Sequence, residues 1–313
     1  MNSTVLTDTP RIPAAAPALR TKAELRAAVA AAKRAGRSVG LVPTMGYLHE
    51  GHLSLIRAAR AECDLVVMSL FVNPTQFGPA EDLDRYPRDE GRDLRLAAEA
   101  GADLVFAPAL EEVYPDGPDA AATRVEVTGA LTGVLDGDPE RRGPEHFRGV
   151  ATVVAKLFNI VDPDVAYFGQ KDAQQAVVIR RMVCDLDFPV RIEVLPTVRE
   201  ADGLAMSSRN AYLEPEDRQR ATALSRALAA AERGARAGSL GIGLDAARRE
   251  LDGAGIEPEY LEARDAETLE PVHALEGRPV LVLVAARVGA ARLIDNVLIR
   301  PDEPHVNKPH TNT

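Results

Sequence analysis

The feature that most constrains the fold is a continuous apolar run over residues 65–72 (LVVMSLFV), which has the length of one β-strand. A strand without polar alternation is typical of a parallel sheet that helices cover on both faces. Shorter apolar runs lie at 38–43, 103–107, 165–168 and 190–195, and segments with helical periodicity lie at 21–36, 49–62, 89–100, 147–161 and 170–186. Strands that alternate with helices in this way predict an α/β fold, a Rossmann-like doubly wound parallel sheet.

The pattern changes near residue 197, where a polar loop leads into helix-rich sequence. We expect helices at 215–237 and 244–251 and strands near 258–261, 279–285 and 291–299. The 313 residues therefore divide into a Rossmann-like domain over 1–197 and a smaller α+β lid domain over 198–300. Segment 1–18 is expected to be a flexible leader, and segment 301–313 a disordered tail.

Composition excludes several classes of protein. The net charge of −10 argues against a nucleic-acid partner, because binding to that backbone depends on a basic surface. No stretch approaches the roughly 20 apolar residues of a membrane helix, and the N-terminus does not resemble a secretory signal. Cys63 and Cys184 predict neither a disulfide framework nor a metal site, so we expect a cytoplasmic protein.

The first polar motif is residues 43–52 (PTMGYLHEGH), at the junction of a predicted strand and a predicted helix. His49 and His52 are three residues apart and share one face at the helix N-terminus, where free N–H groups and the helix dipole attract phosphate. Two imidazoles there are suited to stabilising a leaving pyrophosphate. The spacing differs from the H-E-x-x-H of zinc proteases. The alternative is a pair of histidines at an ordinary helix start.

The second motif, residues 168–175 (FGQKDAQQ), also follows a predicted strand. Lys171 supplies a compact positive charge for a phosphate, and Gln175 lies on the same face, where it can bind a hydroxyl or a carboxylate. Asp172 has the alternative role of a helix cap. Gln76 follows the strand at 65–72 and is expected to reach the same cleft as His49, with a turn cap as its alternative.

The third motif, residues 206–210 (MSSRN), lies in the polar loop between the two predicted domains. Two hydroxyls followed by Arg209 are suited to closing over phosphates, although the same composition is common in surface loops. The sequence contains neither a Walker A motif nor G-x-G-x-x-G, and no triad or carboxylate pair is evident. These residues predict an α/β nucleotidyl-transferring enzyme without a covalent nucleophile.

Beyond these motifs, residues 49–52 resemble the HxGH signature of the nucleotidylyltransferase superfamily. Four segments (VPTMGYLHEGHLSLIRAAR, SLFVNPTQFGPAEDLDRYPR, HFRGVATVVAKLFNIVDPDVAYFGQKDAQQ and PTVREADGLAMSSRNAYL) resemble the pantothenate synthetase (pantoate–β-alanine ligase) family in order and spacing, and the likeness spans about residues 20–295. The resemblance implies ATP-dependent condensation of (R)-pantoate with β-alanine through pantoyl adenylate, giving pantothenate, AMP and pyrophosphate. It also implies Mg²⁺ and a homodimer, for which the apolar helix from Phe147 is a candidate interface.

The resemblance also implies roles for individual residues. His52 matches the proton donor, and Gln76 and Gln175 match the residues that hold pantoate, with Gln76 also facing β-alanine. Asp93 matches one of two acids expected near Mg²⁺, but Arg92 replaces the other, so Asp93 is equally a candidate for a helix-surface charge. The further catalytic groups are His49, Lys171, Ser207, Ser208 and Arg209. The expected ATP-binding residues are Met45, Gly46, His49, His52, Gly169, Gln170, Lys171, Asp172, Val198, Met206, Ser207, Ser208 and Arg209.

Two alternatives remain. A different adenylyltransferase with the same HxGH site would release pyrophosphate without forming an amide, but NPTQFG and GQKDAQQ favour a pocket for a small hydroxy acid. A non-catalytic nucleotide-binding regulator would need damaged chemistry residues, whereas His49, His52, Lys171 and Arg209 are all present.

Overall fold

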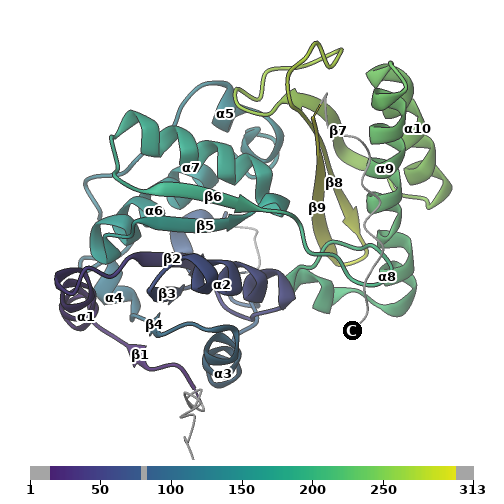
Figure 1. The fold of residues 1–313 in the computed structure, drawn as a ribbon. Helices are drawn as coiled ribbons and strands as arrows, with labels where there is room; N and C mark the ends of the chain where they lie inside the picture. The colour runs from purple at the N-terminus through teal and green to yellow at the C-terminus, as the bar shows by residue number, and fades with distance from the viewer. Residues whose placement is uncertain (1–14, 79–82, 301–313) are drawn as a thin grey trace, which may run out of the picture. The chain divides into compact units, whose positions relative to one another are not determined.

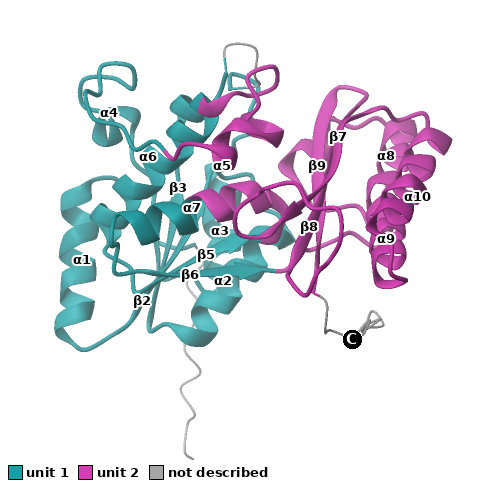
Figure 2. Ribbon diagram, turned by 90° about the horizontal axis from the view of Figure 1, so that it is seen from above, with its two compact units in different colours: residues 1–126, 145–169, 179–195 teal, residues 127–144, 170–178, 196–313 magenta. Residues whose placement is uncertain are grey.

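The computed structural model describes residues 15–78 and 83–300. The chain forms two compact units (Figure 2): unit 1 contains residues 1–126, 145–169 and 179–195, and unit 2 contains residues 127–144, 170–178 and 196–313. The predicted boundary after residue 197 lies close to residue 196, where the chain passes from unit 1 to unit 2 for the last time. Residues 127–144 and 170–178, however, belong with the C-terminal part, although the sequence analysis placed them in the first domain.

The predicted leader and tail lie mostly outside the described residues, which begin at residue 15 and end at residue 300. Residues 15–18 contradict the prediction of a flexible leader over 1–18. Ala16 is 2% exposed and donates its backbone N–H to the Leu94 carbonyl, and Ala18 begins the first strand of the sheet. The chain is therefore already folded before residue 18.

Unit 1 is built on a six-stranded sheet in the order β1-β4-β3-β2-β5-β6 (Figure 1), and every neighbouring pair is parallel. The predicted doubly wound α/β fold is thereby confirmed. The strands are β1 (Ala18–Leu19), β2 (Val39–Thr44), β3 (Leu65–Leu70), β4 (Leu104–Phe106), β5 (Val165–Gly169) and β6 (Arg191–Leu195). The helices are α1 (Lys22–Arg34), α2 (Glu50–Glu62), α3 (Glu90–Ala100), α4 (Leu110–Val113) and α6 (Pro144–Val161), and α7 (Ala173–Asp185) begins in unit 2 and ends in unit 1.

Local sequence explains where these elements begin and what they bury. Thr21 and Glu24 form the capping box that starts α1, as the sequence predicts. The central strand β3 is buried along nearly its whole length, as a strand covered on both faces must be. Helix α6 buries most of its residues within the chain, including Phe147 and Phe158. The expectation that this helix offers an apolar interface is therefore wrong, because its apolar side chains form core.

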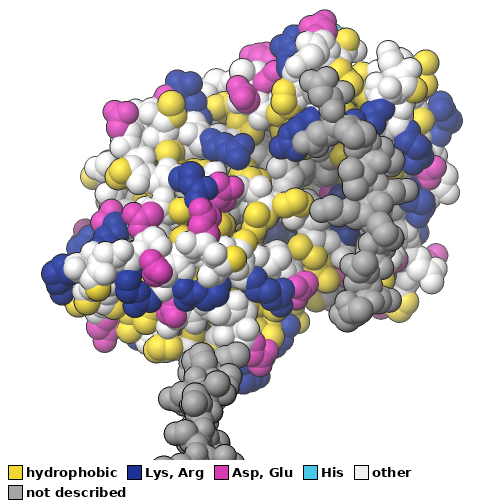
Figure 3. All heavy atoms as spheres, in the orientation of Figure 1, with side chains coloured by type: hydrophobic (Ala, Val, Ile, Leu, Met, Phe, Trp, Pro, Cys, Tyr) yellow, Lys and Arg dark blue, Asp and Glu magenta, His cyan; other side chains and the backbone are white. Residues whose placement is uncertain are grey.

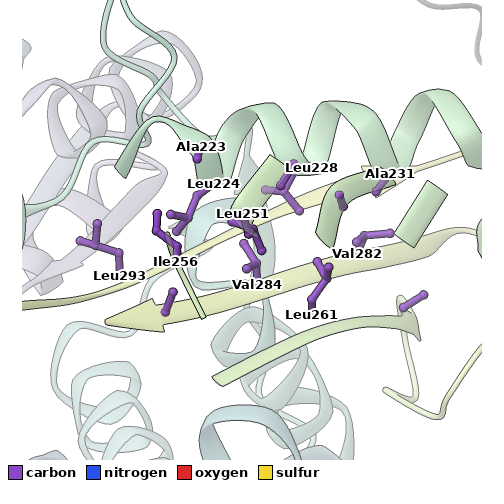
Figure 4. Packing of buried hydrophobic residues seen from close by; sticks show 14 of the residues in the cluster. Ala223, Leu224, Leu228, Ala231, Leu251, Ile256, Leu261, Val282, Val284 and Leu293 are labelled. Carbon is purple, nitrogen blue, oxygen red and sulfur yellow. The ribbon is translucent and has the colours of Figure 1, made fainter. Parts of the chain in front are cut away.

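Unit 2 contains a three-stranded antiparallel sheet, β7-β8-β9, with three helices against it. Figure 4 shows apolar side chains of helix α9 and of the sheet meeting in one core. A Cβ built on Gly234 of α9 would lie 2.6 Å from the Gly243 nitrogen of α10, so the two helices cross in near backbone contact. The elements are α8 (Pro215–Ala221), α9 (Ala223–Arg236), α10 (Leu240–Gly253), β7 (Pro258–Asp265), β8 (Val280–Val288) and β9 (Ala291–Ile299).

The single helix predicted over 215–237 is in fact two helices, separated at Thr222. The Thr222 hydroxyl donates to the Gln219 carbonyl at 2.7 Å, a local bond of the kind through which threonine competes with helical geometry. Helix α10 is longer than the predicted 244–251, because Ser239 caps it by accepting the Ile242 N–H.

A buried ion pair joins residues 127–144 to the sheet of unit 2. This segment contains two single-turn helices, α5 (Ala130–Gly133) and η2 (Leu135–Gly137). Asp136 accepts from Arg292 at 2.9 Å and from the Tyr260 hydroxyl at 2.8 Å. Burial alone disfavours the ionised carboxyl, but the Arg292 charge and hydrogen bond outweigh it and lower the pKa of Asp136.

The surface carries charges of both signs. On the face drawn in Figure 3, basic and acidic side chains are interspersed, consistent with a chain whose net charge is −10. Over the described ranges, no helix is both long enough and apolar enough to span a bilayer.

Candidate functional site

The sheet of unit 1 has its topological switch point at β2, which pairs with β3 on one side and β5 on the other. Open α/β sheets bind ligands beyond the carboxyl ends of the strands at such a point. The segment 45–52 follows β2, Gln76 follows β3, and Gly169 ends β5. Three of the predicted segments therefore leave the same edge of three neighbouring strands.

The two histidines form a reciprocal cap at the N-terminus of α2. His49 is the N-cap residue, and its Nδ1 accepts the Gly51 N–H at 3.2 Å. His52 Nδ1 accepts the His49 N–H at 3.3 Å, and the ring centroids are 4.1 Å apart. Because both Nδ1 atoms act as acceptors, each neutral ring carries its proton on Nε2. Each ring thus carries an N–H group at the positive end of a helix, where phosphates bind in many proteins.

The turn between β2 and α2 is held by Asp93 of α3. Its two carboxylate oxygens accept the N–H groups of Tyr47 at 2.7 Å and Leu48 at 2.8 Å. Gly46 has φ +89°, and a Cβ there would lie 2.9 Å from Asp93 Oδ2, so only glycine fits this close approach. Arg92 donates to the Leu48 carbonyl at 2.8 Å and completes the attachment.

Asp93 is 1% exposed, which rules out its alternative role as a helix-surface charge. Burial raises the pKa of its carboxyl, against the opposing effect of the two backbone N–H donors. No group of three or more potential metal ligands occurs among residues 15–78 and 83–300. Since both oxygens already receive N–H groups, Asp93 fits an anchor for the phosphate-binding turn better than a ligand for Mg²⁺.

Gln76 lies in the 3₁₀ turn η1 (Pro74–Gln76) and is held from two sides. Asn73 is 1% exposed and donates its Nδ2 to Gln76 Oε1 at 3.1 Å, while the Tyr114 hydroxyl donates to Asn73 Oδ1 at 2.9 Å. His146 of α6 donates from Nδ1 to the Gln76 carbonyl at 2.7 Å. The side chain amide of Gln76 is therefore preoriented, as a residue that holds a small polar substrate needs to be.

In unit 2, Lys171 lies in the turn η3 (Gln170–Asp172), with its Nζ 3.6 Å from Asp172 Oδ1 and its side chain 19% exposed. Gln174 is buried and donates to the carbonyls of Leu131 and Val134, so it is structural. Gln175, its neighbour, is half-buried.

The loop of unit 2 that carries residues 198–209 is hydrogen-bonded along its length. The Met206 N–H donates to the Val198 carbonyl at 3.0 Å, closing a small hairpin. Ser207 caps the 3₁₀ helix η4 (Ser208–Tyr212) by accepting the Arg209 N–H at 3.3 Å. Asn210 donates to Glu200 Oε1 at 2.9 Å. Within unit 2 the predicted phosphate-binding loop is therefore an ordered turn.

The residues that hold these segments in place were not among the predicted site residues. Asn73 and Tyr114 orient Gln76, and Asp295 and Asn296 of β9 bond to the loop and the turn of unit 2. Asn73 is the first residue of the NPTQFG motif, so its position in the sequence indicated a role near Gln76. Tyr114 and the β9 pair lie far along the chain from their partners, and no local pattern identifies such contacts.

Comparison with known proteins agrees with this geometry. The family model of pantoate–β-alanine ligase matches residues 17–298. The pantothenate synthetase of Moorella thermoacetica is 56% identical over 288 residues, covering 91% of this chain and 99% of that protein. The crystal structure of pantothenate synthetase from Thermus thermophilus is 51% identical, with a TM-score of 0.82 and coverage of 90% of this chain and 98% of that one.

A third comparison concerns a ligand complex. The pantoate–β-alanine ligase of Francisella tularensis, in a crystal structure with β,γ ATP and β-alanine, is 31% identical with a TM-score of 0.75, covering 91% of this chain and 98% of that one. The matches extend over nearly the whole chain and include all the segments described above. The chain therefore belongs to the pantoate–β-alanine ligase family.

Proposed function

We propose that this chain condenses (R)-pantoate with β-alanine, converting ATP to AMP and pyrophosphate through a pantoyl-adenylate intermediate. The observation that carries the proposal is the pair of imidazole N–H donors at the N-terminus of α2, beyond the switch point of the sheet. The family match and the relative solved with β,γ ATP and β-alanine support the same substrates.

In the first step, a carboxylate oxygen of pantoate attacks the α-phosphorus of ATP, and the bond to pyrophosphate breaks. Negative charge grows on the leaving group, and donors already in place stabilise it without reorganisation. As a neutral ring, His52 stabilises this charge by a hydrogen bond from Nε2, with His49 beside it. To act as the proton donor that the resemblance implies, His52 must first become an imidazolium, which breaks its Nδ1 bond to the His49 N–H. Lys171, Ser207, Ser208 and Arg209 bind the triphosphate, Arg209 with the two-pronged geometry that suits phosphate oxygens. The other nucleotide contacts come from residues 45–46, 169–170, 172, 198 and 206.

In the second step, the amine of β-alanine attacks the carbonyl carbon of the adenylate. AMP leaves with the oxygen that bridged phosphorus and carbon, and the nitrogen releases its proton as pantothenate forms. Gln76 and Gln175 hold pantoate, and Gln76 also faces β-alanine. With no covalent enzyme intermediate, the rate gain comes from holding two reactants in line, which can supply roughly 7–11 kcal/mol.

Mg²⁺, the homodimer and the cytoplasmic location stay predictions. Asp93, the expected Mg²⁺ ligand, already accepts two backbone N–H groups, so the two steps above involve only the side chains of this chain. A metal that accompanies ATP usually keeps several waters and binds through the phosphates, which needs few protein ligands.

A product assay tests the proposal. Purified protein is supplied with ATP, Mg²⁺ and D-pantoate, with and without β-alanine, and AMP, pyrophosphate and pantothenate are separated by chromatography. We expect steady AMP release only with both substrates, in a one-to-one ratio to pantothenate. Pyrophosphate release without any amide product would favour a different adenylyltransferase. Binding of ATP with no turnover in any combination would favour a regulator.

A further inference from the structure

Strand β9 carries two consecutive buried polar residues, Asp295 and Asn296, which are 3% and 4% exposed. It is an edge strand of the sheet in unit 2 (Figure 1). Successive side chains of a strand point to opposite faces. On one face Leu293 joins the core under α9, and on the other Ile294 packs with a second cluster. Asp295 and Asn296 therefore reach to opposite sides of the sheet, and β9 contacts both η3 and η4.

Asp295 holds the loop that leads to Arg209. Its carboxylate receives both prongs of Arg199, Nη1 at 2.6 Å and Nη2 at 3.0 Å. Arg199 also donates to the Gly203 carbonyl at 3.1 Å, across the hairpin whose base is residues 198 and 206. A bidentate pair fixes direction as well as distance. The hairpin from which residues 207–209 emerge is thus attached to β9.

Asn296 holds the turn that carries Lys171. Its Nδ2 donates to the carbonyls of Gln170 and Lys171, both at 2.9 Å, and its Oδ1 accepts from Gln170 Nε2 at 3.0 Å. The side-chain amide of Asn296 thus makes two hydrogen bonds as a donor and one as an acceptor. Asn296 therefore fixes the backbone from which the Lys171 ammonium projects.

We propose that Asp295 and Asn296 form a positioning pair. From one strand, Asp295 holds the Ser207–Arg209 loop and Asn296 holds the Lys171 turn, the two segments proposed to bind the triphosphate of ATP. This inference rests on the proposed function for its substrate. Neither residue is proposed to touch ATP. Each acts through a segment that does.

Stability alone gives no reason for polar residues here. Buried polar groups and ion pairs are often no more stabilising than apolar residues of similar volume. The neighbouring positions Leu293, Ile294 and Leu298 show that both faces accept apolar side chains. What an apolar pair would lose is the fixed direction of Arg199 and the two held carbonyls, which are the features that place the phosphate-binding groups.

The test uses Asn296→Ala and Asp295→Asn in the full-length enzyme, with Ile299→Ala as the matched control. Ile299 lies on the same strand, is fully buried and contacts neither segment through a side-chain hydrogen bond, so its truncation destabilises β9 without releasing them. Asp295→Asn keeps the shape of the side chain and still accepts from Arg199, so it remains informative where Asn296→Ala fails to fold. Each protein is studied below its own unfolding temperature.

We expect KM for ATP to rise about tenfold in each test variant, since an unpaired buried group costs on the order of 1–3 kcal/mol. KM for β-alanine should change by less than about twofold, and Ile299→Ala should leave both constants unchanged. Calorimetric titration with ATP alone should show the same loss of affinity. Unchanged ATP affinity in folded Asn296→Ala and Asp295→Asn would overturn the inference. If both test variants bind ATP more weakly but the wild-type enzyme makes no pantothenate, only the proposed function is overturned.

Discussion

Gly149 of α6 provides the sharpest test of how the core places Gln76. Helix α6 packs on η1 at this position, where Asn73 Nδ2 donates to the Gly149 carbonyl at 3.3 Å. A Cβ built on Gly149 would lie 2.7 Å from the Gln76 backbone nitrogen and closer still to the Thr75 carbonyl. Nonbonded heavy atoms prefer about 3.5 Å or more, so Gly149→Ala must push η1 away from α6. No side-chain rotation relieves this overlap, because the atoms concerned are backbone.

Gly149→Ala has two opposing effects on the free energy of unfolding. Alanine gains about 1 kcal/mol over glycine in a helix, whereas overpacking a rigid core costs about 1–3 kcal/mol and displaces backbone. Since a shift of several tenths of an ångström in backbone is needed, we expect a net loss. Gly241 of α10 is the matched control, because a Cβ there meets no atom within 4 Å. Gly241→Ala should be neutral or stabilising.

The assay combines thermal unfolding with steady-state kinetics. We expect Gly149→Ala to lower Tm by several degrees and to raise KM for pantoate about tenfold, because Gln76 moves with η1. Gly241→Ala should keep the wild-type KM. Gly149→Ala with a wild-type Tm and an unchanged KM for pantoate would refute the packing argument.

Three further predictions concern single side chains. His52→Ala should lower kcat about 100-fold or more while circular dichroism stays unchanged, and wild-type turnover would remove His52 from the chemistry. Asp93→Asn replaces one acceptor by a donor facing a backbone N–H, so KM for ATP should rise about tenfold; raising Mg²⁺ should not restore it, and recovery with Mg²⁺ would favour a metal role. Asp136→Asn should cost about 3 kcal/mol of unfolding free energy at pH 7. Because the pKa of Asp136 is lowered in the folded state, its stabilisation is present above about pH 4 and is lost as the pH falls, so the variant and wild-type curves should converge in acid. A constant difference down to about pH 2 would contradict the ion pair with Arg292.

The elements that sequence predicts well are those whose burial follows a simple period. Strand β3 is a continuous apolar run because both its faces are covered. The start of α1 is predictable because Thr21 and Glu24 form a capping box. The histidine pair was also identifiable, because a strand end followed by a helix start is a local pattern. The protonated nitrogen of each ring was not predictable from the sequence. It is fixed by the two capping hydrogen bonds, which depend on the three-dimensional geometry of the turn.

The misassigned parts lack such periods. Residues 127–144 contain only single-turn helices and belong with unit 2 through Asp136, whose partners Tyr260 and Arg292 are more than 100 residues away. The interruption at Thr222 coincides with one side-chain hydrogen bond inside an otherwise helical pattern. The resemblance implies a place near Mg²⁺ for Asp93, which stays a prediction, but no local pattern indicates its contacts with residues 47 and 48, which anchor the turn. Polar contacts between residues far apart in the sequence are thus the features that could not be predicted from it.

An isotope experiment tests whether pantoate is activated as an adenylate. Pantoate labelled with ¹⁸O in both carboxylate oxygens is converted in the presence of ATP and β-alanine, and the products are analysed by mass spectrometry. We expect one ¹⁸O in AMP and one in the amide carbonyl of pantothenate, because the bridging oxygen leaves with the phosphate. Unlabelled AMP, or ¹⁸O recovered in inorganic phosphate alongside ADP, would contradict it.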